Sequence, residues 1–333
     1  MSEFASRKLR IVSFLAIILI VVLHSNLSGV AQGRELIVQM FITSEITRIA
    51  VPVFFMISGL LFFYNYKSDF KAFYLSKLKK RLKTLVIPYL IFSIFGYIVI
   101  MTAWYMTGEK PNSVTMTGFK GMFYYILWHP IGCYQLWFIR DLFLMILLSP
   151  ILYILYNNKW TAGVYILFLV ILYFISKSCS ESLQSIFYFS IGAYIGLCHR
   201  DYLEIRAESK IWMFVTILVW VALCVISSMS GYEWIHKAAI VIGIAGFWQL
   251  YDIYLWRIGW EKLELVSLTF FVYLLHEPLL TIVKRINFAL FGTDYTMPTY
   301  ILSPIITIYI LFVTGRMFRR RFPKCYKIIS GGR

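Results

Sequence analysis

Long apolar runs recur along the chain from its start to near its end, and they constrain the fold more than any other feature. About 20 apolar residues can cross the hydrocarbon core of a bilayer as one α-helix. The runs that we assign as spans lie at residues 9–27, 43–64, 84–105, 135–156, 161–177, 184–198, 211–230, 238–256, 265–284 and 299–316. Only 14% of the residues are charged, against about a quarter in soluble domains. The sequence therefore predicts an all-α polytopic membrane protein, a bundle of about ten transmembrane helices that forms one domain over residues 1–333.

The positive charges are concentrated between these runs. With the N-terminus inside, 23 of the 32 lysine and arginine residues fall in cytoplasmic segments or the basic tail. Lysine and arginine are enriched in cytoplasmic loops, so this distribution predicts that both termini are cytoplasmic. A net charge of +16 is a feature of many nucleic-acid-binding proteins, but charge placed between spans indicates membrane topology and contact with lipid instead. We therefore expect no nucleic-acid partner.

The cysteines give no indication of a metal site. None of the five stands in a CxxC pair or at another spacing typical of zinc ligands: Cys133, Cys179, Cys198, Cys224 and Cys325. Such spacings are what identify zinc sites and disulfide frameworks in a sequence. We expect neither a bound metal nor a disulfide framework.

Histidines stand inside two of the apolar runs. His24 ends a run that is apolar from Ile11 to Leu23 except for Ser13, and His276 lies beside Glu277 in SLTFFVYLLHEPLL. An ionisable side chain within a span is costly and is by default a candidate functional residue. The alternative for His24 is an interfacial position at the mouth of the span. On the predicted topology both histidines lie in the outer half of their spans, so they could share one polar cavity.

Two further pairs of charged residues lie in apolar surroundings. Glu45 and Arg48 are three residues apart, so on a helix they share a face and can pair, and Pro52 behind them predicts a kink. Arg140 and Asp141 follow each other just inside a span, where they form either a structural salt bridge or a pair that faces substrate. The remaining histidines are predicted to be ordinary surface residues: His129, His199 and His236.

At these residues the chain resembles the acyltransferase-3 family of bacterial integral membrane O-acyltransferases. The matching stretches occur in family order over nearly the whole chain: VVLHS at 21–25, VPVFFMISGLLFF at 51–63, a basic segment running into IPYL at 87–90, QLWFIRDL at 135–142, FYFSIGAYIG at 187–196 and YLLHEPL at 273–279. In size and in the absence of an appended domain, the chain looks like members that acetylate surface polysaccharides or their lipid-linked precursors. The resemblance implies a multi-pass protein of the bacterial inner membrane.

The resemblance also implies the reaction, which is transfer of an acyl group, usually acetyl, from cytoplasmic acyl-coenzyme A to a sugar hydroxyl. His24 would be the general base or a covalent relay for the acyl group, and the sequence leaves both routes open. A carboxylate, Asp141 or Glu277, would orient an imidazole in the site. Arg48 or Arg140 would stabilise the oxyanion. His276 completes the set of candidate catalytic residues.

Basic residues at the inner face would hold the phosphates of the donor, acetyl-CoA. The family carries an arginine or lysine eleven residues before its histidine, where this chain has Ser13, so Arg10 one turn earlier is the candidate cation. A paired-arginine motif before the third span matches at Arg81 but has Thr84 in its second position. The predicted donor site is therefore Arg10, Ser13, Lys80, Arg81 and Lys83.

A second function fits the same fold. A transporter that moves a small solute or a lipid-linked sugar without chemistry would use a similar helical bundle, since fold alone does not determine function. Transporters commonly show repeated halves with interrupted helices at matching positions, and we find no such repeat. Binding or hydrolysis of acyl-coenzyme A would separate the two functions. The sequence is compatible with a homo-oligomer and does not require one.

Overall fold

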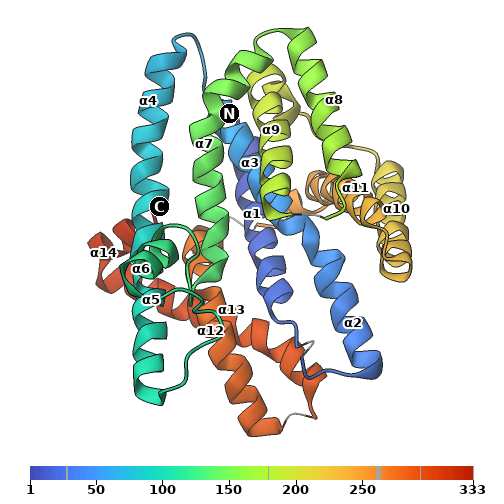
Figure 1. The fold of residues 1–333 in the computed structure, drawn as a ribbon. Coiled ribbons are helices and arrows are strands. Elements are labelled where there is room, and N and C mark those ends of the chain that lie inside the picture. Colours follow the sequence, from blue (N-terminus) through green and yellow to red (C-terminus); the bar gives the residue numbers. More distant parts are fainter. Residues whose placement is uncertain (28, 179, 260–263, 293, 333) are drawn as a thin grey trace.

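The computed structural model describes the chain except for residues 28, 179, 260–263, 293 and 333. Cys179, Lys262 and Arg333, which entered the cysteine and charge arguments, lie outside the described residues. The described part contains helices and no strand, which confirms the all-α class (Figure 1). Its α-helices are α1 (Glu3–His24), α2 (Gly33–Ser44), α3 (Ala50–Phe63), α4 (Phe70–Arg81), α5 (Ile87–Thr107), α6 (Gly118–Leu127), α7 (Trp137–Tyr156), α8 (Lys159–Ile175), α9 (Glu181–Cys198), α10 (Lys210–Ser230), α11 (Glu233–Ile253), α12 (Thr269–Phe291), α13 (Thr296–Arg321) and α14 (Pro323–Ile329).

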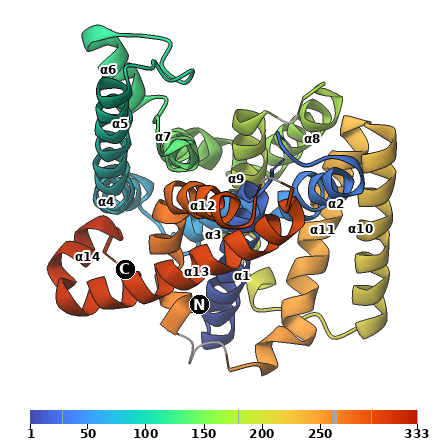
Figure 2. The same ribbon diagram turned by 90° about the horizontal axis from the view of Figure 1, so that it is seen from below.

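Four helices, α1, α3, α7 and α9, stand side by side in the middle of the molecule (Figures 1 and 2). The α10–α11 pair lies on one side of this group, and the continuous α4–α5 rod lies on the other side, with α6 and α14 against it. Helices α12 and α13 pack against each other and against α1. Helix α1 carries ten buried residues, so it is a central helix of the bundle.

All ten predicted spans fall on helices. By length and hydropathy, seven helical segments of the described residues could each cross a membrane: Gly33–Phe63, Phe70–Thr107, Tyr134–Tyr156, Lys210–Ser230, Glu233–Arg257, Glu264–Phe291 and Thr296–Arg321. Helices α1, α8 and α9 are the three predicted spans outside that set. The chain is a multi-pass membrane protein, and about ten remains an approximate count of its spans.

The span predicted at 43–64 is not one helix. Helix α2 ends at Ser44, a 3-10 segment covers Ile46–Ile49, and α3 begins at Ala50. Pro52 thereby lies in the first turn of α3, where a backbone N–H has no partner within the helix and its absence costs little. The predicted kink is therefore a change of helix type at Glu45.

The basic segment before the third span is a helix, not the loop that the spacing of the spans suggested. Asp69 caps α4 by accepting a hydrogen bond from Ala72 N at 3.1 Å, a typical N-cap interaction. A π-helical turn, Leu82–Val86, then joins α4 to α5. Pro88 lacks the N–H that would bond to the Thr84 carbonyl four residues earlier, which accounts for an irregular turn here. The basic residues of α4 are thus held on a rigid rod.

Helices α3 and α9 approach each other very closely through glycines. A Cβ on Gly192 would lie 2.0 Å from the Met56 carbonyl oxygen, and one on Gly59 would lie 2.2 Å from that of Phe189. Gly192 and Gly196 form a GxxxG pair, which allows two helix backbones in a membrane to come close. The Ser58-Gly59 pair and the FYFSIGAYIG stretch therefore meet at one interface, and this interface holds α3 and α9 side by side in the wall of the site described next.

Candidate active site

His24 is the last residue of α1, and its ring is half-buried between two other ionisable side chains. Its Nδ1 is hydrogen bonded to the hydroxyl of Tyr134, which begins the 3-10 turn before α7. The ring of His276 from α12 lies 5.4 Å from that of His24, centroid to centroid. The structure thus brings together the two histidines that the sequence singled out, and it adds Tyr134.

His276 is fully buried, and one of its ring nitrogens is already engaged. Its Nδ1 lies 2.7 Å from the Tyr273 carbonyl oxygen, which can only accept, so Nδ1 carries the hydrogen. Its Nε2 is buried and has no hydrogen-bond partner among the described residues. Buried polar atoms are nearly always paired. An unpaired imidazole nitrogen beside His24 is therefore a feature that a bound substrate or an internal proton transfer would explain.

A cavity of about 390 Å³ opens beside His24; its described lining includes His24 but not the fully buried His276, so the predicted cavity shared by both histidines is lined by one of them. It lies among α1, α3, α7, α9 and α12. Its polar lining consists of His24, Arg48, Ser58, Tyr134, Gln135, Glu181, Gln184, Thr269 and Tyr273. The lining extends from Arg48 in the 3-10 segment to Ser58 in α3, ten residues or about 15 Å at 1.5 Å per residue. The cavity also touches Leu85, which lies in the π-helical turn one helical turn beyond Arg81. One continuous space therefore reaches from the histidine to the turn that carries Lys83.

The predicted Glu45–Arg48 pair does not form. Glu45 begins the 3-10 segment that contains Arg48, but its carboxylate is engaged by side chains of α10 and α11. Glu45 instead contacts His236 Nδ1 at 2.9 Å and accepts a hydrogen bond from Ser227 at 3.1 Å. The prediction that His236 is an ordinary surface residue was wrong, because its ring is half-buried against Glu45. Arg48 is left exposed and lines the cavity.

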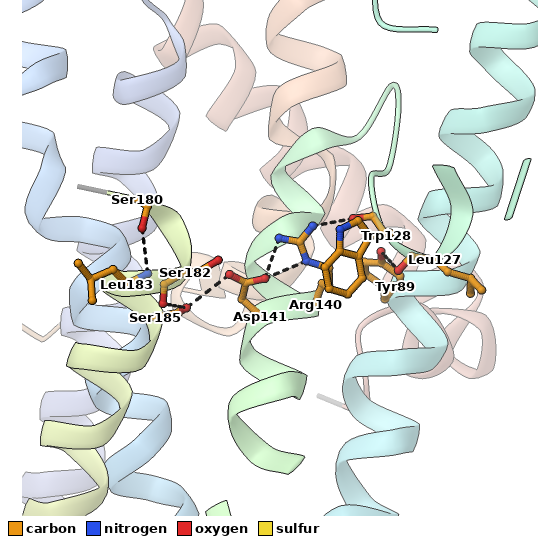
Figure 3. A network of polar contacts seen from close by, with 9 residues as sticks. All are labelled: Tyr89, Leu127, Trp128, Arg140, Asp141, Ser180, Ser182, Leu183 and Ser185. Carbon is orange, nitrogen blue, oxygen red and sulfur yellow. Dashed lines mark hydrogen bonds and ion pairs between the residues drawn. The ribbon is translucent and has the colours of Figure 1, made fainter. Parts of the chain in front are cut away.

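Arg140 and Asp141 bind each other but do not line the cavity that contains His24. Asp141 is buried, pairs with Arg140 at 2.7 Å and accepts a hydrogen bond from Ser185 on α9 at 3.4 Å (Figure 3). Arg140 also donates to the Trp128 carbonyl at 2.6 Å and lies over the Trp128 ring. The pair connects α7 to α9 and to the end of α6. This geometry favours the structural salt bridge over a pair that faces substrate.

Glu277 is half-buried and follows His276 on α12. It accepts a hydrogen bond from Thr281 at 3.3 Å, and its carboxylate attracts the ammonium group of Lys284. Lys284 in turn donates to the His24 carbonyl at 3.0 Å. Lys284 thus links Glu277 to the backbone of His24. Among the described contacts, no hydrogen bond joins the Glu277 carboxylate to either imidazole. Within the described residues, no group of three His, Cys, Asp or Glu side chains is arranged to hold a metal.

Of the nine polar lining residues only His24 and Arg48 were predicted site residues, and the others include Tyr134, Glu181 and Gln184. Glu181 and Gln184 both lie in the first turn of α9, and an acidic residue directly before an apolar run was a usable signal. Tyr134 directly precedes the QLWFIRDL stretch and is 44% exposed, so much of its ring faces open space. Nothing in the sequence pattern distinguishes it from the other 23 tyrosines.

Comparison with known proteins identifies the family. A family model described as an acyltransferase domain matches residues 9–316. The chain belongs to the acyltransferase-3 family. It is 27% identical over 307 residues to the succinoglycan biosynthesis protein ExoH of Rhizobium meliloti (strain 1021), covering 89% of this chain and 82% of that protein. No solved structure matches it. The protein is therefore a membrane acyltransferase of the acyltransferase-3 family, and His24, His276 and the cavity all lie within the matched range.

The residues predicted to hold the donor of this acyltransferase lie on two helices. Arg10 is exposed on α1 and Ser13 is half-buried one turn beyond it, and neither lines the cavity. Lys80 and Lys83 are exposed around the π-helical turn, and Arg81 is half-buried at the end of α4. No ion pair engages Arg81 among the described residues, so its guanidinium is available to an anion one helical turn from the cavity lining at Leu85.

Proposed function

We propose that this acyltransferase moves an acetyl group from cytoplasmic acetyl-CoA to a hydroxyl of a cell-surface polysaccharide or its lipid-linked precursor. The observation that carries the proposal is the cavity that extends from His24 to the basic turn at Leu85. The printed name of the relative, a succinoglycan biosynthesis protein, supports a polysaccharide acceptor. The protein would lie in the bacterial inner membrane with both termini in the cytoplasm, so that the donor enters beside Arg81.

His24 is the proposed general base. With its Nδ1–H donating to the Tyr134 oxygen, Nε2 keeps its lone pair and can accept a proton. As an acceptor hydroxyl attacks the thioester carbonyl carbon, its proton passes to Nε2. Arg48, the nearest unpaired cation of the lining, stabilises the oxyanion. Collapse breaks the carbon–sulfur bond, and the departing thiolate takes the proton from the imidazolium, which returns His24 to its neutral form.

A covalent route uses the same residues. His24 Nε2 would attack the thioester carbonyl carbon, the carbon–sulfur bond would break, and coenzyme A would leave as its thiolate while the acyl group stays on the imidazole. The acceptor hydroxyl would then attack the acyl group, the carbon–nitrogen bond would break, and the proton of the hydroxyl would pass to the thiolate, which leaves His24 neutral. Labelled protein recovered after incubation with [¹⁴C]acetyl-CoA in the absence of acceptor would identify this route. If no label remains on the protein, the single-step route is supported.

The donor site is proposed to be the basic surface around the π-helical turn. Arg81, Lys80 and Lys83 are cations on a rigid rod, and guanidinium and ammonium groups bind phosphate through charge-assisted hydrogen bonds. Arg10 on α1 is a further candidate from the neighbouring helix. The thin acyl-bearing arm of the donor would then enter the cavity past Leu85, while its phosphates stay at the surface.

Purified protein in nanodiscs tests the proposal with [¹⁴C]acetyl-CoA as donor. Membranes from cells that lack the protein provide the acceptor. Wild type should transfer label to glycan, and His24→Ala should lose at least about a hundredfold, the usual scale of a general base. His129→Ala, a change at an exposed histidine outside the cavity, should stay within twofold. An active His24→Ala enzyme would contradict the catalytic assignment, and solute movement in proteoliposomes without acetyl transfer would support a transporter.

A further inference from the structure

A second, polar cavity of about 350 Å³ adjoins the first on the side of α2, α10 and α11. Its lining includes Glu45, Arg48, Gln184, Tyr232, Glu233 and His236. Arg48 and Gln184 line both cavities. The two spaces therefore share a wall, and a molecule that occupies the second can present a group to the first beside Arg48.

The floor of the second cavity is built from buried polar groups on three segments. Glu45 is 8% exposed and holds Ser227 of α10 and His236 of α11 at 3.1 and 2.9 Å. Glu45 is the residue at which α2 ends and the 3-10 turn begins. A buried polar network that is fully satisfied holds its members in one arrangement. This cavity thus has a rigid polar floor, whereas the lining of the first cavity is largely apolar.

The rim offers groups that suit a neutral polyhydroxylated ligand. Glu233 and Tyr232 are both exposed there, at the start of α11. Carboxylates accept hydrogen bonds from hydroxyls, and a tyrosine ring provides an apolar face together with a polar tip. Two carboxylates, Glu45 and Glu233, line this cavity together with Arg48, whereas the residues proposed to hold the donor phosphates include no carboxylate. The charges therefore separate the second cavity from the donor site, where the groups are cationic.

We infer that the second cavity is a subsite for a neutral sugar unit of the acceptor glycan. Glu233 and Tyr232 would bind the unit next to the sugar that is acylated, and Arg48 and Gln184 would lie at the junction. The inference rests on the proposed function, because the second cavity is an acceptor subsite only if the protein transfers an acyl group to a glycan. The binding of a neutral saccharide at this place can be tested without any acyl transfer.

Equilibrium binding tests the subsite directly. The probe is unacetylated glycan released from cells that lack the protein, titrated onto protein in nanodiscs without acetyl-CoA. The Glu233→Gln/Tyr232→Ala double variant should raise the Kd at least fivefold. Glu109→Gln, the same amide change at an exposed outer-loop residue, should stay within twofold of wild type. Both rim residues are exposed, so the substitutions leave the buried Glu45 network in place.

Two results would overturn the inference: a wild-type protein that does not bind the glycan, or a double variant that binds as tightly as wild type. A melting temperature within 2–3 °C of wild type, roughly the shift from a change under 1 kcal/mol, shows that the double variant is folded. Failure of the proposed function would give a different result: wild-type protein would neither hydrolyse acetyl-CoA nor transfer its acetyl group. With active enzyme, the double variant should raise the KM for glycan at least fivefold and alter the KM for acetyl-CoA less than twofold.

Discussion

The hydroxyl of Tyr134 is the one group bonded to the His24 ring among the described contacts, and it holds the ring through Nδ1. Tyr134→Phe keeps the aromatic contact with the imidazole and removes only this hydrogen bond. A hydrogen bond is worth about 1–1.5 kcal/mol, so we expect kcat to fall about tenfold. The KM for acetyl-CoA should change less than twofold, because Tyr134 is far from the basic turn in the proposed donor path. Steady-state kinetics in nanodiscs measures both constants.

Tyr124→Phe is the matched control for that substitution. Tyr124 lies on α6 outside the cavity and stacks on His129, so kcat should equal that of wild type. A Tyr134→Phe enzyme with unchanged kcat would mean that the hydroxyl does not orient the base.

At the residue scale, the sequence predicted the ionisable residues but not their partners. His24 and His276 come from spans some 250 residues apart, and their outer-half positions sufficed to predict that they lie near each other. The Glu45–Arg48 pairing was wrong because the Glu45 carboxylate is bound by Ser227 and His236 from other helices, which spacing within one segment does not describe. Arg140 and Asp141 pair with each other, and Arg140 also donates to the Trp128 carbonyl at the end of α6. The helical periodicity of the sequence does not predict a contact between these separate segments.

At the scale of helices, the contact of α3 with α9 permits no added atom. Gly192→Ala would place a Cβ 2.0 Å from the Met56 carbonyl oxygen, and a backbone atom cannot move aside by changing rotamer. Overpacking of this kind costs about 1–3 kcal/mol. We expect Gly192→Ala to lower the melting temperature in detergent by several degrees and to reduce acyl transfer, because α3 and α9 both contribute residues to the lining of the cavity.

Gly163→Ala on α8 is the control for a glycine inside a helix. No atom lies within 4 Å of a Cβ built there, and alanine favours a helix over glycine by up to about 1 kcal/mol. This variant should melt at or above the wild-type temperature. If Gly192→Ala melts like Gly163→Ala, the close approach of α3 and α9 is not present in the folded protein.

Helix breaks were harder to predict than helices. Hydropathy located all ten apolar runs, yet it joined α2 to α3 across the 3-10 turn and separated α4 from α5, which the structure joins through a π-helical turn. Both errors lie next to a proline, Pro52 or Pro88. A proline in the sequence indicates that some hydrogen bond is missing, but not whether the chain kinks, bulges or continues.

At the scale of the whole molecule, the sequence predicted the class of protein and could not predict the cavity. Lipid is as apolar as the helix surfaces, so hydrophobicity does not determine which spans pack together in a membrane. The lining of the cavity comes from five helices that are dispersed over the chain, from Ile20 to Tyr273. Its polar members became a recognisable set only when the helices were placed side by side.

The orientation of the molecule in its membrane follows from where its basic segments lie. Helix α14 packs against α5, and Gly331 abuts the Thr84 carbonyl in the π-helical turn, so the basic tail and the basic α4 lie together. Basic segments stay in the cytoplasm, hence Cys325, which is exposed on α14, should face inside. In a variant with the other cysteines replaced by alanine, a membrane-impermeant maleimide should label Cys325 in inverted vesicles and not in intact spheroplasts. Adding Glu109→Cys, at the far end of α5, should give a thiol that reacts in spheroplasts. If Cys325 reacts in spheroplasts before lysis, the assigned orientation is reversed. The side from which acetyl-CoA enters would then be reversed as well.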